Sequence, residues 1–196
     1  NVAVGYNTLS TDTKGSASVA IGVSALATQN FTTATDVYNT AVGANAGASV
    51  TTAIYNTLIG GLAGDALTSG NNNTAIGVAA LSTDTLGDRN VAIGVSALEQ
   101  QNFTTSTDSY NVAVGYGVGL RVTTGIQNAI VGGLAGDALT DADLNTAVGY
   151  AALTTDTLGS NSTALGYGTL SSQNFTTATN SYNVAVGSLA GNQVTT

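Results

Sequence analysis

A five-residue motif recurs eleven times in the 196-residue chain and constrains the fold more than any other feature. Each copy begins with Asn or Ser and ends with Gly, as in NVAVG at 1–5 and SVAIG at 18–22. Consecutive copies are seventeen residues apart, except that one spacing in every four is longer by four residues. Four such units make one super-repeat, and the super-repeats span 1–72, 73–144 and, incompletely, 145–196. We interpret the chain as one repetitive segment, without separate domains, of a longer protein.

The motif predicts a short β-strand that ends at a glycine corner. Its second and fourth residues share one face, because side chains alternate along a strand. The third residue, on the other face, is Ala in nine copies and Leu58 or Ile130 in the other two. A small residue at this position indicates that another backbone comes close. The glycine suits a corner with positive φ or tight approach.

A second apolar point follows the glycine by four or five residues, as in NTLST and SALAT, and we expect a second short strand there. Seventeen residues cannot bury a face alone, whereas stacked copies can pair strand upon strand. The sequence thus predicts an all-β fold, a parallel β-solenoid (β-roll) of about eleven 17–21-residue coils. At about 4.8 Å per stacked strand the rod would be roughly 50 Å long.

The first motif position predicts a ladder of stacked side-chain amides that bond one another and the turn backbone. We assign these residues a structural role. They are Asn1, Asn39, Asn56, Asn73, Asn90, Asn111, Asn128, Asn145 and Asn183.

The composition of the chain argues against a catalytic, nucleic-acid-binding or membrane-spanning role. Charged residues make up 7% of the chain, against about 25% in typical proteins, and the net charge is −8. Without a basic patch we expect no nucleic-acid binding, and no apolar run is long enough to span a membrane. His and Cys are absent, so the usual nucleophile–base pairs and thiolate sites cannot form. We expect no enzyme activity, no catalytic residue, no cofactor and no metal site.

The acidic residues favour turns over binding sites. Asp12, Asp84 and Asp156 recur once in each super-repeat, which is typical of turn-capping residues. The sequence GGLAGDAL at 60–67 and 132–139 departs from the spacing of calcium-binding nonapeptides. The cluster of Asp137, Asp141 and Asp143 leaves weak cation binding as a minor alternative.

The four extra residues of the long units fall in the stretch QNFTT. It occurs at 29–33, 101–105 and 173–177, so three protrusions would follow one edge about every 19 Å. Each contains an Asn-Phe-Thr sequon. The Phe rings either are exposed anchors or fold back over Tyr38, Tyr110 and Tyr182, and we favour the second reading. The candidate lateral-contact or glycan residues are Asn30, Phe31, Asn102, Phe103, Asn174 and Phe175.

SVAIG at 18–22 and NTAVGYAALTTDTLGSN at 145–161 carry a resemblance to two groups of extracellular fibres. The first resembles the β-roll head of trimeric autotransporter adhesins, and the second the repetitive shaft of phage tail fibres. The resemblance implies a parallel homotrimer, and trimerisation would bury the apolar points left on the second face of each coil. It favours a structural rod that carries a receptor-binding tip.

Three alternatives remain open for the function. An adhesin head would bind a cell-surface receptor or glycan, and a self-assembling filament would stack end to end. An ice-binding solenoid is a remote third, because the Thr-Asp-Thr pairs at 11, 83 and 155 recur only once in four coils.

Overall fold

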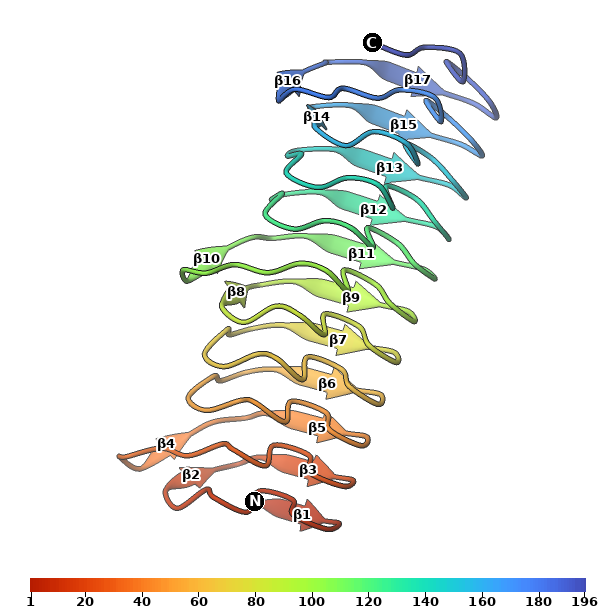
Figure 1. Ribbon diagram of the computed structural model, residues 1–196. Helices are drawn as coiled ribbons and strands as arrows, with labels where there is room; N and C mark the ends of the chain where they lie inside the picture. The colour runs from red at the N-terminus through yellow and green to blue at the C-terminus, as the bar shows by residue number, and fades with distance from the viewer.

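Each copy of the motif forms one strand of a single parallel sheet in the computed structural model, which describes all 196 residues (Figure 1). The chain winds through eleven coils, each beginning at the first residue of a motif copy and here numbered 1 to 11. This confirms the predicted parallel β-solenoid. The sheet consists of β1 (Val2–Val4), β3 (Val19–Ile21), β5 (Thr40–Val42), β6 (Thr57–Ile59), β7 (Thr74–Ile76), β9 (Val91–Ile93), β11 (Val112–Val114), β12 (Ala129–Val131), β13 (Thr146–Val148), β15 (Thr163–Leu165) and β17 (Val184–Val186).

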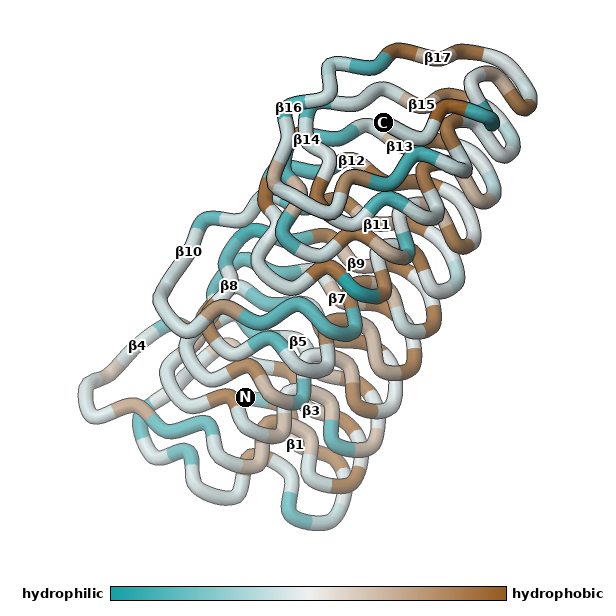
Figure 2. Tube along the Cα trace, turned by 45° about the horizontal axis from the view of Figure 1, so that its top comes forward, coloured by the Kyte–Doolittle hydropathy of each residue, from teal (hydrophilic) through white to brown (hydrophobic).

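The strands pair in register, so each motif position forms a column along the stack. Ala20 is opposite Ala41, and Ala41 is opposite Leu58. The third motif position faces the interior, where its Ala, Leu or Ile side chain is fully buried in nearly every coil. The second and fourth positions face outward, and hydrophobic segments recur coil after coil along the stack (Figure 2).

The second strand predicted in every unit is absent from the second apolar point. That segment is a turn, because Leu9 has φ 47° and its equivalents in the other coils are also left-handed. Such backbone cannot continue an extended strand. Short second strands form elsewhere, only beside the long coils. They pair as β2 (Gly15–Ser16) with β4 (Thr35–Asp36), β8 (Gly87–Asp88) with β10 (Thr107–Asp108), and β14 (Gly159–Ser160) with β16 (Thr179–Asn180).

Large and small residues compensate one another inside the coils. Leu26 fills the turn of coil 2, whereas coils 3 and 4 have Gly47 and Gly64 there. A Cβ added at Gly64 would lie 2.8 Å from Leu58 Cδ2 and 2.8 Å from Leu67 Cδ1. The glycines thus make room for larger residues at other positions of the same coil.

The motif glycine forms the corner after each strand. Gly60 has φ 134°, and a Cβ added there would lie 2.4 Å from the carbonyl oxygen of Gly77 in the next coil. Both the positive φ and the close approach of the next backbone therefore require glycine.

Candidate functional site

Three loops project from one edge of the stack, where the strands of the large sheet begin. They comprise residues 29–38, 101–110 and 173–182, and β4, β10 and β16 lie within them (Figures 1 and 2). Each loop belongs to a long coil and returns to pair with the coil before it. The four extra residues thus form the predicted lateral protrusions, one in each super-repeat.

A buried polar cluster, here named the clamp, holds each loop to the preceding coil. In the second copy the Asp84 carboxylate is fully buried and accepts hydrogen bonds from Gln101 Nε2 at 2.6 Å and from the Phe103 N–H at 3.2 Å. It also caps its own turn, since the Gly87 N–H donates to Oδ1 at 3.0 Å. Burial raises the pKa of Asp84, and the hydrogen bonds from Gln101 and the backbone partly oppose this shift.

The clamp recurs in the other two super-repeats and continues into the next coil. Gln29 Nε2 donates to Asp12 at 2.7 Å, and Gln173 Nε2 donates to Asp156 at 2.6 Å. The Gln101 Oε1 atom in turn accepts from Asn111 Nδ2 at 2.9 Å. One clamp therefore connects three successive coils and fixes the base of the loop.

The glutamines of the clamp were missed by the sequence analysis, although a signal was present. Asp84 and Gln101 occupy the same position of consecutive coils, and Val50 and Leu67 stand there in coils 3 and 4. A polar pair in an apolar column, repeated three times, indicates buried groups that satisfy each other.

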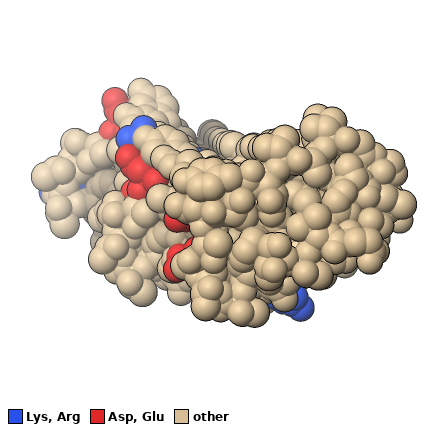
Figure 3. All heavy atoms as spheres, turned by 90° about the horizontal axis from the view of Figure 1, so that it is seen from above, with Lys and Arg blue, Asp and Glu red and all other residues tan.

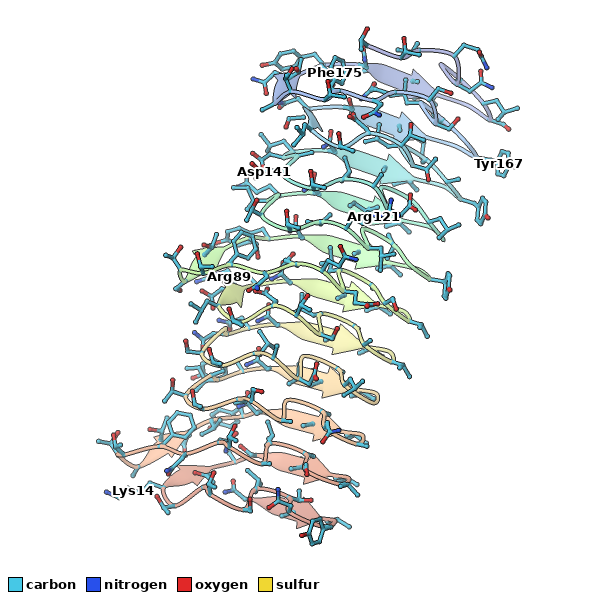
Figure 4. All side chains as sticks on the ribbon, viewed as in Figure 1. Lys14, Arg89, Arg121, Asp141, Tyr167 and Phe175 are labelled. Carbon is cyan, nitrogen blue, oxygen red and sulfur yellow. The ribbon has the colours of Figure 1, made fainter.

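The phenylalanines of the loops turn toward the body of the stack. Phe31 and Phe103 are 7% and 6% exposed, and Phe175 is half-buried. Figure 4 shows Phe175 on the loop side, where its Cδ2 atom would be 2.7 Å from a Cβ added at Gly159. The rings therefore cover the turn beneath the loop.

Two of the tyrosines expected beneath the Phe rings have other partners. Tyr38 stacks on Tyr55 with ring centroids 5.8 Å apart. Tyr110 lies 5.6 Å from the Arg89 guanidinium, which also forms a 2.7 Å ion pair with Asp108. Phe31 and Phe103 are thus folded back rather than exposed, as predicted, but no aromatic pair joins a Phe ring to Tyr38, Tyr110 or Tyr182.

The loop asparagines lie at the surface. Asn30, Asn102 and Asn174 are exposed, and Oδ1 of each accepts a hydrogen bond from a Thr hydroxyl of the preceding coil at 3.1, 3.0 and 3.2 Å. None of the three Nδ2 atoms has a protein partner. The structure thus brings the six predicted loop residues together in pairs, with an exposed Asn beside an inward-facing Phe.

The first motif position forms a column of buried amides. Asn56 is typical: its Nδ2 donates to Gly70 O in the same coil at 2.9 Å, and its Oδ1 accepts from the Asn73 N–H of the next coil at 2.8 Å. The amide therefore closes its own coil and bonds to the next one. Asn1 is exposed, Asn183 is half-buried, and the seven between them are at most 1% exposed: Asn39, Asn56, Asn73, Asn90, Asn111, Asn128 and Asn145.

The remaining acids do not converge on a site. Asp137 and Asp141 each accept from a Thr hydroxyl of an adjacent coil, and Asp143 accepts from the Ile126 N–H. No group of three or more acidic residues is arranged to hold a metal ion. Acidic atoms gather over one part of the surface seen from above, on the left of Figure 3, and most of the visible surface is uncharged.

The outer face of the large sheet carries an apolar column over its whole length, beside a second-position column that is Thr in five coils. The fourth motif position is Val, Ile or Leu in every coil, and no strand of the sheet contains a charged residue. Ile59 and Leu165 keep 37% and 44% of their surface exposed, and Val4 keeps 56%. Here this surface is named the sheet face.

A threonine column follows the turn, and the Thr-Asp-Thr pairs noted in the sequence form only part of it. The thirteenth position of the coil is Thr in eight coils and Asn in the three long ones. Thr51 donates to Thr68 O, and Thr68 to Thr85 O, each at 3.1 Å. These hydroxyl protons therefore strengthen the stack. The exposed Gln100 and Arg121 interrupt the neighbouring column of Thr and Ser, which leaves no regular Thr-x-Thr plane.

No known protein family, curated protein or solved structure matches the chain. The structure contains no helix that could cross a membrane. What the fold defines is the class of β-solenoid repeat proteins.

Proposed function

We propose that this chain is a rod segment of an extracellular homotrimeric fibre, most similar to the shaft of a phage tail fibre. The sheet face is the observation that carries the proposal. Its apolar stripe runs through all eleven coils, without a charge on any strand. Exposed apolar patches of this length are unusual on a monomer and are typical of interaction surfaces.

Besides a surface for assembly, a rod needs mechanical stiffness. The chain forms 106 backbone hydrogen bonds, most of which join successive coils, and the Asn column and Thr column add side-chain bonds between coils. Bending the rod would stretch several of these bonds in the same coil. Such a rod would hold a receptor-binding tip at a fixed distance from its anchor.

The test is the mass of the protein under native conditions, with matched charge variants. We expect the wild-type chain to be a trimer and Ile93→Lys to dissociate it, because the lysine would be placed on the sheet face. Gln100→Lys introduces the same charge in the same coil, at an exposed side chain off the sheet, and should remain trimeric. A monomeric wild type would refute the trimer, and equal behaviour of the two variants would refute the sheet face as its interface.

A surface adhesin is the second candidate, and the lateral loops favour it. Three similar protrusions on one edge could bind a repeated receptor or glycan on another cell. Electron microscopy of native material separates the two functions: rods confined to virions support the tail fibre, and rods on cells support the adhesin.

A further inference from the structure

The three lateral loops share a feature that neither stiffness nor trimerisation uses. Asn30, Asn102 and Asn174 each begin the sequence Asn-Phe-Thr, which is the acceptor signal for N-linked glycosylation. Both ends of the signal, the Asn and the Thr, are exposed in all three loops.

The hydrogen bonds of these side chains leave the reactive atom free. The Asn102 Oδ1 atom and the Phe103 carbonyl oxygen share the proton of the Thr85 hydroxyl, at 3.0 and 2.9 Å, which orients the amide, while Nδ2 has no protein partner. The contact between the coils needs only a hydrogen-bond acceptor at the position of this Asn. Asp would supply one equally well, so the amide nitrogen is the part of Asn that the stack does not use.

The site of attachment is also compatible with the folded stack. The loops lie at the edge where the strands begin, and they project away from the coils (Figures 1 and 4). The Phe of each sequon anchors the loop from inside, while the following Thr32, Thr104 and Thr176 side chains make no hydrogen bond that a sugar would break.

We propose that Asn30, Asn102 and Asn174 carry N-linked glycans, which would place one oligosaccharide about every 19 Å along the edge of the rod. The donor is an oligosaccharide linked to a polyprenyl pyrophosphate. The anomeric C–O bond to the pyrophosphate breaks, and the leaving pyrophosphate keeps its electron pair. The anomeric carbon forms a bond to Nδ2, and the amide loses one proton to a base of the transferase. The proposal rests on the proposed function for the export of the chain past such an enzyme, as for the surface adhesin, and the expectation for Asn72 below also rests on burial of the sheet face.

Two further sequons in the same chain serve as internal controls. Asn161 is half-buried, and its Nδ2 donates to Asn180 Oδ1 at 3.0 Å, so its amide is already used. Asn72 is followed at once by the buried Asn73 and by Thr74 in β7. A sugar on Asn72 would lie beside the sheet face and prevent its burial, so we expect none on the assembled protein.

The experiment is secretion of the chain from yeast, followed by intact mass measurement before and after digestion with peptide N-glycosidase. We expect three glycans, and peptide mapping should locate the Asn-to-Asp conversions left by the enzyme at residues 30, 102 and 174. Thr32→Ala destroys one sequon without touching Asn30 and should remove one glycan, whereas Thr32→Ser should keep it. Asn161→Gln should remove none.

A secreted chain with no glycosidase-sensitive mass would overturn the proposal, and so would glycans on Asn72 or Asn161 with the loops empty. Mass measurement under native conditions distinguishes failure of the glycan proposal from failure of the proposed trimer. An unglycosylated trimer would refute the glycan sites alone, and a glycosylated monomer would refute the trimeric rod alone.

Discussion

Leu58 and Gly64 offer a direct test of the size compensation inside the coils. Leu58 replaces the usual Ala of the motif and is fully buried, and it fills the space that Gly64 leaves in the turn. Leu58→Ala should leave a cavity, whereas Gly64→Ala should overfill the same region. If the two residues share one volume, each substitution should partly repair the damage done by the other.

The expected magnitudes follow from the geometry. Leu58→Ala should cost about 3–4 kcal/mol, in the middle of the range for buried leucines, since the glycines beside it have no side chains to fill the cavity. Gly64→Ala should cost about 2–4 kcal/mol: about 1–3 from overpacking against Leu58 and Leu67, and about 1 from the φ of 55°. The double variant should be about 1–3 kcal/mol more stable than the sum of the two losses predicts.

The assay is denaturant unfolding of the four proteins, followed by circular dichroism. Gly136→Ala provides the control, because Gly136 occupies the same turn position in coil 8 with φ 53°. Combined with Leu58→Ala it should be additive within about 0.5 kcal/mol, since the two sites are four coils apart. Additivity of the adjacent pair as well would refute the shared volume.

Three further outcomes are expected from unfolding measurements. Gly77→Ala should cost about 3 kcal/mol or more, because a strained φ alone costs about 1–3 kcal/mol and the added Cβ would lie 2.4 Å from the next carbonyl. Gly61→Ala, whose Cβ would have no neighbour closer than 3.9 Å, should change little. Gln101→Leu should cost about 2–3 kcal/mol, because it removes a donor from a buried carboxylate, and loss of less than about 0.5 kcal/mol would contradict the clamp. The raised pKa of Asp84 means that the folded state binds this proton more tightly than the unfolded chain. Its contribution to stability is therefore complete below about pH 3.9, the value for a free Asp, and is lost as the pH rises through the folded pKa. Asp84→Asn should flatten the pH dependence of the unfolding free energy in that window, and an unchanged slope would assign the dependence to other groups.

The stacking of the coils could be predicted from the sequence because a single constraint repeats eleven times. Each motif supplies the same small inward residue and the same terminal glycine, so any in-phase stack aligns Ala20 with Ala41 and places their glycines at one corner. The turn after the glycine could not be predicted from the same pattern. Leu9 and its equivalents adopt a left-handed φ, which an apolar residue rarely takes, and only contacts with neighbouring coils select it.

The loops were located correctly as the place of the extra residues, but their interior was not foreseen. Periodicity shows that the Phe recurs, whereas the burial of Phe103 depends on the turn beneath it and on the bond from its N–H to Asp84 of the clamp. Comparing the same position of successive coils would have revealed Gln101 beneath the loop. For a β-solenoid, comparing equivalent positions of successive coils therefore reveals more of the side-chain contacts than comparing neighbours along the chain.

The four-coil period reflects two kinds of coil, those that form the clamp and those with apolar residues at the same position. In the two complete super-repeats, the third and fourth coils place apolar residues such as Val50 and Leu67 where the long coil and the coil before it place the clamp. The clamp buries polar groups in a thin core, and each of them needs a hydrogen-bond partner. Apolar packing stabilises the stack without that requirement. Coils that carry no loop have no need of the clamp. The length of the super-repeat is thus the spacing between two lateral loops. The loops are the places where the surface of the stack differs from that of the other coils.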